Sequence, residues 1–185
     1  LTGQMMEPIE WHEIPHRELP PKDWATTGKH GRSHPNFVTS LSIDPNDCNE
    51  MNQRLARKYA LITEKEIRYE AKDCEDAEVV LVAYGTPARV VLSAIEELRR
   101  QGVKAGLFRP ITLWPFPEKQ LHDLAGEDHV KVVVDVEMSL GQMIDDVRLA
   151  VEGQKPVKFA GVAGGLIPTV EDIVEAAKNA LKEAE

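Results

Sequence analysis

Two sets of residues in this 185-residue sequence match patterns found in enzyme sites. The first is His12-Glu13-Ile14-Pro15-His16, which fits the H-E-x-x-H pattern of zinc peptidases. That chemistry needs both histidines one turn apart on a helix, with the glutamate acting on a zinc-bound water. Pro15 stands between the histidines, and an interior proline costs a helix about 3 kcal/mol. We therefore interpret the pattern as a chance match.

The second set follows expected strands. Gly85-Thr86-Pro87 opens a helix and could hold an anion through backbone N–H groups, although it is neither G-x-G-x-x-G nor a P-loop. Arg109 and Glu137 also come directly after strands. They could pair with each other, contact a substrate or cross an interface. A pair within the chain is the interpretation that assumes no function. The sequence has no Ser-His-Asp order and no cysteine in a glycine turn, so it shows no complete active site.

Alternating patterns from residue 73 onward predict the elements that carry these residues. Apolar runs at 79–84, 103–108, 130–136 and 157–160 predict strands buried on both faces, and a helical pattern follows each of them. Thr86 is the expected N-cap of the first helix, and residues 169–172 have the form of a capping box. The alternation predicts an α/β fold with a parallel sheet between two helix layers. Ligands and partners then meet the loops at the carboxyl ends of the strands.

The first part of the chain has a different pattern. Residues 1–48 are rich in proline and contain scattered apolar side chains such as Trp11, Trp24 and Phe37. We expect an irregular, extended arm that lies on a surface of its own domain or of a neighbour. Residues 49–72 are expected to form a connecting helix, capped by Asp47 or Asn49, with a basic face that we interpret as solvated. The predicted domains are therefore 1–48, 49–72 and 73–185.

Composition excludes several classes of protein. The net charge of −9 argues against a general nucleic-acid-binding surface. No apolar run approaches the roughly 18–20 residues that span a bilayer, and the first residues do not form a signal peptide, so we expect a cytoplasmic protein. Two cysteines are too few for an iron–sulfur cluster or a zinc ribbon. Because the chain starts at Leu1, we expect a fragment or a processed product.

Three stretches of the domain resemble a known family: VAYGTPARVVLSAIEELRRQGVKAGLFRPITLWPFP, VVVDVEMSLGQMIDDVRLAVEG and GVAGGLIPTVEDIVE. They are similar to the end of the α subunit of 2-oxoacid:ferredoxin (or acceptor) oxidoreductases, of the 2-oxoglutarate or branched-chain 2-oxoacid type. The resemblance implies a transketolase C-terminal-domain-like fold for residues 73–185. Ser139 stands where the family commonly has asparagine, which weakens any role assigned to that position.

The resemblance also implies a reaction for the whole complex. Such enzymes oxidatively decarboxylate a 2-oxoacid with CoA to an acyl-CoA, using thiamine diphosphate, Mg²⁺ and iron–sulfur clusters. The implied partners are the remainder of the α subunit with its pyrimidine-binding domain, a β subunit and a ferredoxin-type subunit. We expect no cofactor, metal or catalytic residue in this chain, because G-D-G and iron–sulfur patterns are absent from the sequence. The isolated chain is therefore predicted to be inactive.

Three functional hypotheses follow. In the first, the chain is the C-terminal domain of that α subunit; it serves assembly and borders the substrate or CoA approach, where we expect contacts from Arg109, Thr112, Glu137 and Gln142. In the second, it is a stand-alone α/β module that binds an anionic ligand such as CoA. In the third, it is an assembly domain whose arm straps a partner.

Overall fold

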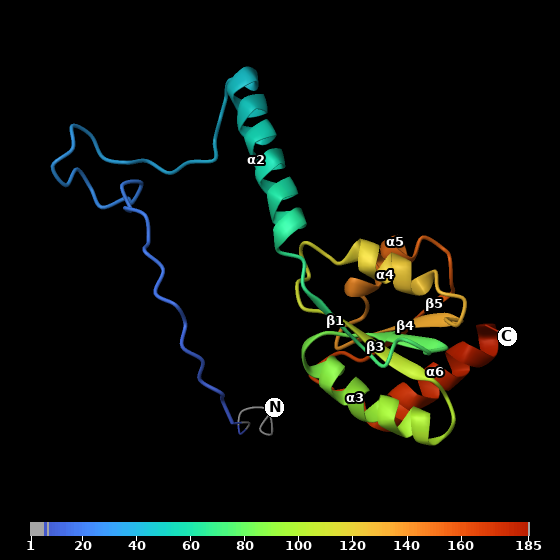
Figure 1. Ribbon diagram of the computed structural model, residues 1–185. Helices are drawn as coiled ribbons and strands as arrows, with labels where there is room; N and C mark the ends of the chain where they lie inside the picture. The colour runs from blue at the N-terminus through green and yellow to red at the C-terminus, as the bar shows by residue number, and fades with distance from the viewer. Residues whose placement is uncertain (1–5, 7, 185) are drawn as a thin grey trace. The chain divides into compact units, whose positions relative to one another are not determined.

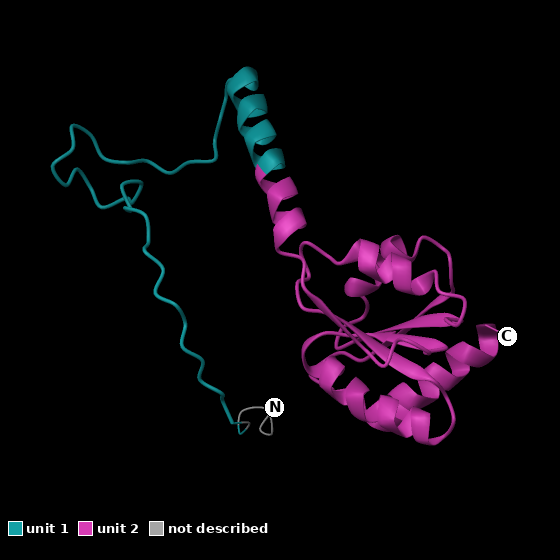
Figure 2. Ribbon diagram, in the orientation of Figure 1, with its two compact units in different colours: residues 1–57 teal, residues 58–185 magenta. Residues whose placement is uncertain are grey.

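The computed structural model describes residues 6 and 8–184, and its internal contacts divide the chain into two compact units. Figure 2 colours unit 1, Leu1–Arg57, and unit 2, Lys58–Glu185. No described residue of unit 1 is buried, whereas unit 2 contains the hydrophobic core. Among the described residues, no helix is both long and apolar enough to cross a membrane.

The arm forms neither helix nor strand at its described positions before Pro45, as its prolines predict. His12 and His16 therefore lie in irregular chain, without the helix that zinc peptidase chemistry requires. One part of the arm is organised locally. The Arg32 guanidinium donates hydrogen bonds to the carbonyl oxygens of Asp23 at 3.1 Å and Gly28 at 2.7 Å, which holds the chain between them in a loop.

Helix α2 spans Pro45–Lys65, and none of its residues is buried. Asp44 caps it, because Asp44 Oδ1 accepts hydrogen bonds from the N–H groups of Asn46 at 2.8 Å and Asp47 at 3.2 Å. The predicted caps, Asp47 and Asn49, were wrong, because the helix begins before both of them. The predicted helix also extended too far, to residue 72. Lys65 ends it, and the backbone beyond pairs with a strand of the sheet instead.

Unit 2 is built on a five-stranded sheet with the order β1-β3-β2-β4-β5. The parallel strands are β2 (Val79–Val82), β3 (Ala105–Pro110), β4 (Val132–Glu137) and β5 (Val157–Gly161), which confirms the four predicted strands. Strand β1 (Tyr69–Lys72) was missed, and it runs antiparallel to β3. Its four residues are all exposed, so they lack the apolar pattern of a buried strand. The unit boundary falls within α2, and the division at 48 and 72 stays a prediction.

Helices cover both faces of the sheet (Figure 1). Helices α3 (Gly85–Arg100) and α6 (Val170–Ala184) pack on one face, and α4 (Glu118–Ala125) and α5 (Met143–Val151) pack on the other. Side chains alternate between faces along a strand. In β4, Val132, Val134 and Val136 therefore pack toward α3 and α6, and Val133 packs in the α4/α5 layer. Asp135 and Glu137 share the face of Val133.

The two predicted helix starts differ in outcome. The capping box of α6 is confirmed: Thr169 Oγ1 accepts from the Asp172 N–H and Asp172 Oδ2 accepts from the Thr169 N–H, both at 3.1 Å. The Thr86 cap of α3 was wrong. The N-cap position is Tyr84, with no side-chain hydrogen bond, because a turn at Gly85 with φ of 58° starts the helix earlier.

Candidate functional site

The loops after the four parallel strands meet at one edge of the sheet, because the carboxyl ends of parallel strands point the same way. Charged residues make up 29% of the chain, yet these loops contain no Asp, Glu, Lys or Arg. We call this surface the uncharged edge and define it by residues 83–88, 111–117, 138–144 and 162–170. A binding site for a charged small molecule would normally present the opposite charge, and the loop residues themselves present none.

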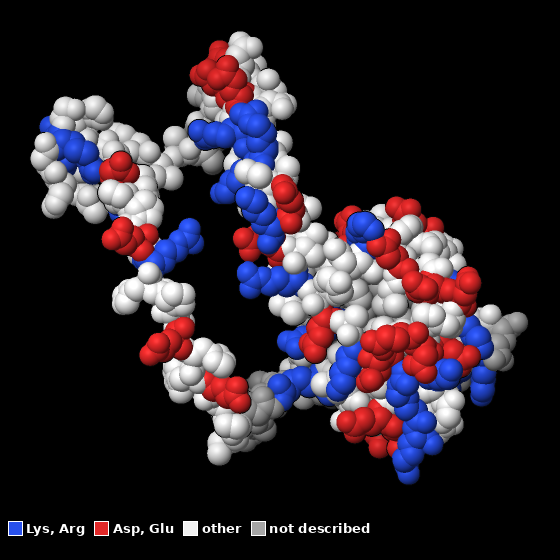
Figure 3. Space-filling view, viewed as in Figure 1, with Lys and Arg blue, Asp and Glu red and all other residues white. Residues whose placement is uncertain are grey.

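Large apolar side chains are exposed along the uncharged edge. Leu140 is 86% exposed, Leu166 is 66% exposed and Trp114 is 61% exposed. The Trp114 ring contacts Tyr59 edge-on, with 5.3 Å between the ring centroids. Figure 3 shows an uncharged, white area beside the last turns of α2, whereas charges of both signs cover much of the rest of unit 2 in this view. Exposed apolar residues without charge are typical of the core of a protein–protein interface.

The opposite edge has the reverse character. Four acidic residues, Asp73, Glu75, Asp76 and Glu78, lie just before β2, and Asp76 forms ion pairs with Arg99 at 2.8 Å and Lys104 at 3.7 Å. This edge is therefore a charged surface with local ion pairs. The strand-end loops therefore differ from the opposite edge, and charges close to them, such as Arg89, Arg109 and Asp145, belong to the flanking helices and strand.

Glu137 is the acidic group that reaches the uncharged edge from β4, and it is only 1% exposed. Its Oε1 accepts hydrogen bonds from the N–H groups of Gln142 and Ile144, each at 3.0 Å, and its Oε2 accepts one from Ser139 Oγ at 2.9 Å. Burial raises the pKa of Glu137, but hydrogen bonds from Asp135 and from the start of α5 outweigh it and lower the pKa overall. Glu137 thus caps α5 and fixes the loop before it.

Asp135 was not among the predicted site residues. It is fully buried, and no N–H or O–H donor of another described residue reaches its carboxyl oxygens, so the carboxyl of Glu137 is the polar group beside it. Burial raises the pKa of Asp135 to about 9, and the Glu137 carboxylate is the second cause. The signal in the sequence was a single aspartate inside the apolar run of β4.

The four predicted site residues lie at two places: Arg109 and Thr112 at the end of β3, and Glu137 and Gln142 at the end of β4. Arg109 Nη1 lies 3.3 Å from Glu70 Oε2, and these residues face each other across β3 and β1. Thr112 Oγ1 accepts a hydrogen bond from the Arg68 N–H at 3.0 Å, which ties its loop to the chain before β1. Glu137 and Gln142 meet at β4, where Gln142 contributes its backbone N–H and its side chain is exposed. Arg109 does not pair with Glu137, because β2 separates their strands.

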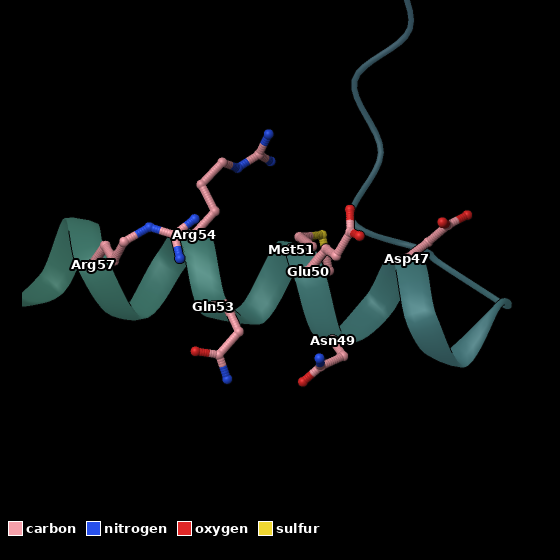
Figure 4. A pocket seen from close by; sticks show the side chains of 7 residues that line it. All are labelled: Asp47, Asn49, Glu50, Met51, Gln53, Arg54 and Arg57. Atoms are coloured by element: carbon pink, nitrogen blue, oxygen red, sulfur yellow. The ribbon is translucent and has the colours of Figure 1, made fainter.

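Two further groups could have supported chemistry. Figure 4 shows a hollow along α2 whose lining side chains, including Glu50, Arg54 and Arg57, all belong to that one helix, so it is an open helix surface. Cys74 is buried, and burial raises the pKa of its thiol to about 12, so it stays protonated and is a poor nucleophile. Within the described ranges, no three His, Cys, Asp or Glu residues are grouped to bind a metal ion.

Gly161, at the end of β5, sets how closely the Ser139 loop approaches the sheet. A Cβ at this position would lie 2.6 Å from the Ser139 carbonyl oxygen and 2.2 Å from Phe159 Cζ. Gly161→Ala is therefore expected to lower the free energy of unfolding by about 1–3 kcal/mol. Urea denaturation measures this. Gly126→Ala is the control, because its new Cβ would meet the flexible Gln154 side chain first, and equal losses in both variants would contradict the prediction.

A family model described as pyruvate:ferredoxin oxidoreductase core domain II matches residues 77–173 of the chain. The chain belongs to this family. The matched range runs from the start of the parallel sheet into α6, so it includes every loop of the uncharged edge. This membership confirms the resemblance to 2-oxoacid:ferredoxin oxidoreductase subunits.

Curated relatives agree with this assignment. The ketoisovalerate oxidoreductase subunit VorB of Methanothermobacter thermautotrophicus is 41% identical over 95% of this chain and 49% of its own length. The 2-oxoglutarate synthase subunit KorA of Methanothermobacter marburgensis is 32% identical over 71% of this chain and 34% of its own length. The chain thus spans about half the length of the VorB relative and less of the KorA relative.

Solved structures share the fold. A 2-oxoglutarate:ferredoxin oxidoreductase from Magnetococcus marinus, with 2-oxoglutarate, coenzyme A and succinyl-CoA bound, matches with a TM-score of 0.60 and 20% identity. The match covers 83% of this chain and 26% of that one. A split-gene transketolase, described as an inactive beta4 tetramer, matches 64% of this chain and 42% of its own with a TM-score of 0.54 and 23% identity. These likenesses confirm the predicted transketolase-like α/β fold.

Proposed function

We propose that this chain is a C-terminal portion of the α subunit of a thiamine diphosphate-dependent 2-oxoacid:ferredoxin oxidoreductase, where it serves subunit assembly. The uncharged edge is the observation that carries the proposal. Its exposed apolar side chains need a protein partner to remove them from water, and family membership indicates what kind of partner that is. The partners are the pyrimidine-binding part of the α subunit, the β subunit and a ferredoxin-type subunit.

The residues of this chain do not fit a thiamine diphosphate site. A diphosphate with Mg²⁺ needs carboxylate, carbonyl or cationic ligands, and the loops of the uncharged edge contain no charged side chain. Glu137 is buried and already accepts hydrogen bonds from its own loop. The cofactor therefore belongs to other parts of the assembly, and the chemical step is assigned to them.

A role beside the substrate or CoA approach is a finer part of the proposal. CoA carries phosphates, which arginine and lysine bind. Arg109 is the nearest cation in sequence to the loop after β3, and its side chain is 43% exposed although it pairs with Glu70. The stand-alone CoA-binding hypothesis is weaker, because it requires a cationic pocket and the strand-end loops supply no cation of their own.

Reconstitution tests the proposed function. The chain is produced with the polypeptides encoded beside its gene, and 2-oxoacid- and CoA-dependent reduction of a viologen dye is measured. We expect co-purification, activity in the complete mixture only, and no heat of CoA binding to the chain alone at millimolar ligand. Decarboxylation by the isolated chain, or failure to co-purify with any of these polypeptides, would contradict the proposal.

The arm has a testable part in this assembly. Trp11 is 88% exposed and Trp24 is 66% exposed, and neither side chain contributes to the core of unit 2. Changing both to alanine is expected to weaken association with the partner polypeptides by about 10-fold or more, since tryptophans dominate interface energies. The stability of the chain should stay unchanged. Lys22→Ala in the same arm is the control, and an equal effect of both changes would count against a strap.

A further inference from the structure

Strand β4 places two carboxyl groups next to each other in the α4/α5 layer. Asp135 and Glu137 are two residues apart on one strand, so their side chains leave the same face of the sheet. Asp135 is 0% exposed and Glu137 is 1% exposed. Two carboxylates this close and this far from water cannot both be charged without a large cost in free energy.

The surroundings of Glu137 favour its ionised form. Beyond β4 it accepts hydrogen bonds from donors alone, including the N–H groups of Gln142 and Ile144 and the hydroxyl of Ser139. The Ser139 hydroxyl is itself held in place, because its oxygen accepts the Gly141 N–H at 2.9 Å. These donors stand at the N-terminus of α5, where the helix dipole also favours a negative charge. A proton on Glu137 would oppose one of these donors.

Asp135 has the opposite surroundings. No donor in the described part of the chain reaches either of its oxygens. Its partners on the neighbouring strands are Val82 of β2 and Phe159 of β5, which are both apolar. In the same core layer α5 contributes Met143 and Val147, and α4 contributes Leu121. A charge on Asp135 would therefore have no hydrogen-bond donor to stabilise it.

The charged groups on the packed elements do not change this balance. On α5, Arg148 is the cation that acts on Asp135, but its Nη1 lies 3.5 Å from Asp145 Oδ1 and its side chain is 57% exposed. Asp146 of α5 adds negative charge beside Glu137. The titratable residues of α4 are directed elsewhere: Lys119 bonds Asp123, the His122 ring contacts the Ala150 carbonyl and Gln154, and Glu118 is exposed.

We propose that Asp135 is a positioning residue: it stays neutral and gives its proton to a hydrogen bond with the Glu137 carboxylate, so that the pair fixes the Met138–Ile144 loop of the uncharged edge. This deepens the proposed function and rests on it only where partner binding is concerned. Loss of the Asp135 proton at alkaline pH places two charges in the layer and releases the loop from β4.

The sign of the pH effect follows from the direction of the shift. The pKa of Asp135 is raised in the folded chain to about 9 from an ordinary value of 3.8. The folded state therefore binds the proton more tightly than the unfolded state between these values. The contribution of this group to stability is complete below pH 3.8 and is lost as pH rises to about 9. The amide introduced by Asp135→Asn would donate the same hydrogen bond with no proton to lose.

The test uses the 185-residue chain with Asp135→Asn, and with Asp145→Asn as control because that side chain is 78% exposed. Urea unfolding is followed from pH 5 to pH 9.5. We expect the ratio of the folding equilibrium constant of Asp135→Asn to that of the wild type to rise by about tenfold for each pH unit up to pH 9. The free energy of unfolding of Asp145→Asn should change with pH in the same way as that of the wild type. The same pH dependence of stability in Asp135→Asn and in the wild type would overturn the proposal.

Carbon-13 NMR of the wild-type aspartate carboxyls decides the case if Asp135→Asn does not fold. A resonance that titrates near pH 9, together with faster amide exchange at Gln142 and Ile144 above that pH, is expected. An Asp135 resonance that titrates near pH 4 would overturn the proposal. Because both measurements use the chain alone, failure of the reconstituted complex would contradict only the proposed function.

Discussion

Replacing Glu137 with alanine is expected to lower the free energy of unfolding by about 3–5 kcal/mol, which would unfold much of the population of a marginally stable domain. The change removes the acceptor of the Gln142 and Ile144 N–H groups and of the Ser139 hydroxyl. The Ile144 N–H is buried and the other two donors are partly buried. A buried donor left without a partner costs about 1–3 kcal/mol, and the missing side chain leaves a cavity. Urea denaturation at pH 7 measures the loss.

Glu118→Ala is the control, because Glu118 is a glutamate at the N-terminus of a helix in the same layer, as Glu137 is beside the N-terminus of α5, but it is exposed. Its loss should stay within about 0.5 kcal/mol. Glu137→Gln should fall between the two, since its carbonyl oxygen keeps one acceptor while its amide nitrogen faces N–H donors. A Glu137→Ala variant as stable as Glu118→Ala would show that the carboxylate does not cap α5.

The parallel core could be predicted because its central strands are buried on both faces and are therefore mostly apolar. Val79–Val82 and Val132–Glu137 are examples, with every residue buried. Strand β1 gave no such signal. All of its residues are exposed, and its stability comes from backbone pairing with β3 and from Tyr69 stacking on Phe108 with 5.4 Å between ring centroids. A contact between residues so far apart in sequence leaves no local pattern.

The candidate site could be predicted as a location but only partly as a set of contacts. Placing Arg109 and Glu137 at strand ends identified the carboxyl edge. The pairing of Arg109 with Glu70 could not be foreseen, because it depends on the missed strand β1. Asp135 was overlooked because residues 130–136 were interpreted only as an apolar strand. The absence of charge along the edge was visible in the sequence, but it became meaningful only when the structure brought four separate loops together.

Leu140→Asp is expected to weaken association of the chain with the remaining polypeptides of the enzyme by about 100-fold while leaving the fold intact. Leu140 is 86% exposed, so the substitution removes little packing within the chain. In the assembly, the new carboxylate would be transferred from water to an uncharged surface with no cation among the loops of the edge. Analytical ultracentrifugation or surface plasmon resonance with the co-purified partners measures the affinity.

Leu149→Asp is the matched control, because it makes the same change at a leucine that is 69% exposed on α5, outside the loops of the uncharged edge. If apolar exposure in general drove association, both variants would lose affinity equally. If the uncharged edge is the interface, only Leu140→Asp should lose affinity. Raising the salt concentration should not restore that affinity, because salt screens charge–charge repulsion far better than it offsets the desolvation of a single buried charge. Equal affinities for the two variants would place the interface elsewhere on the chain.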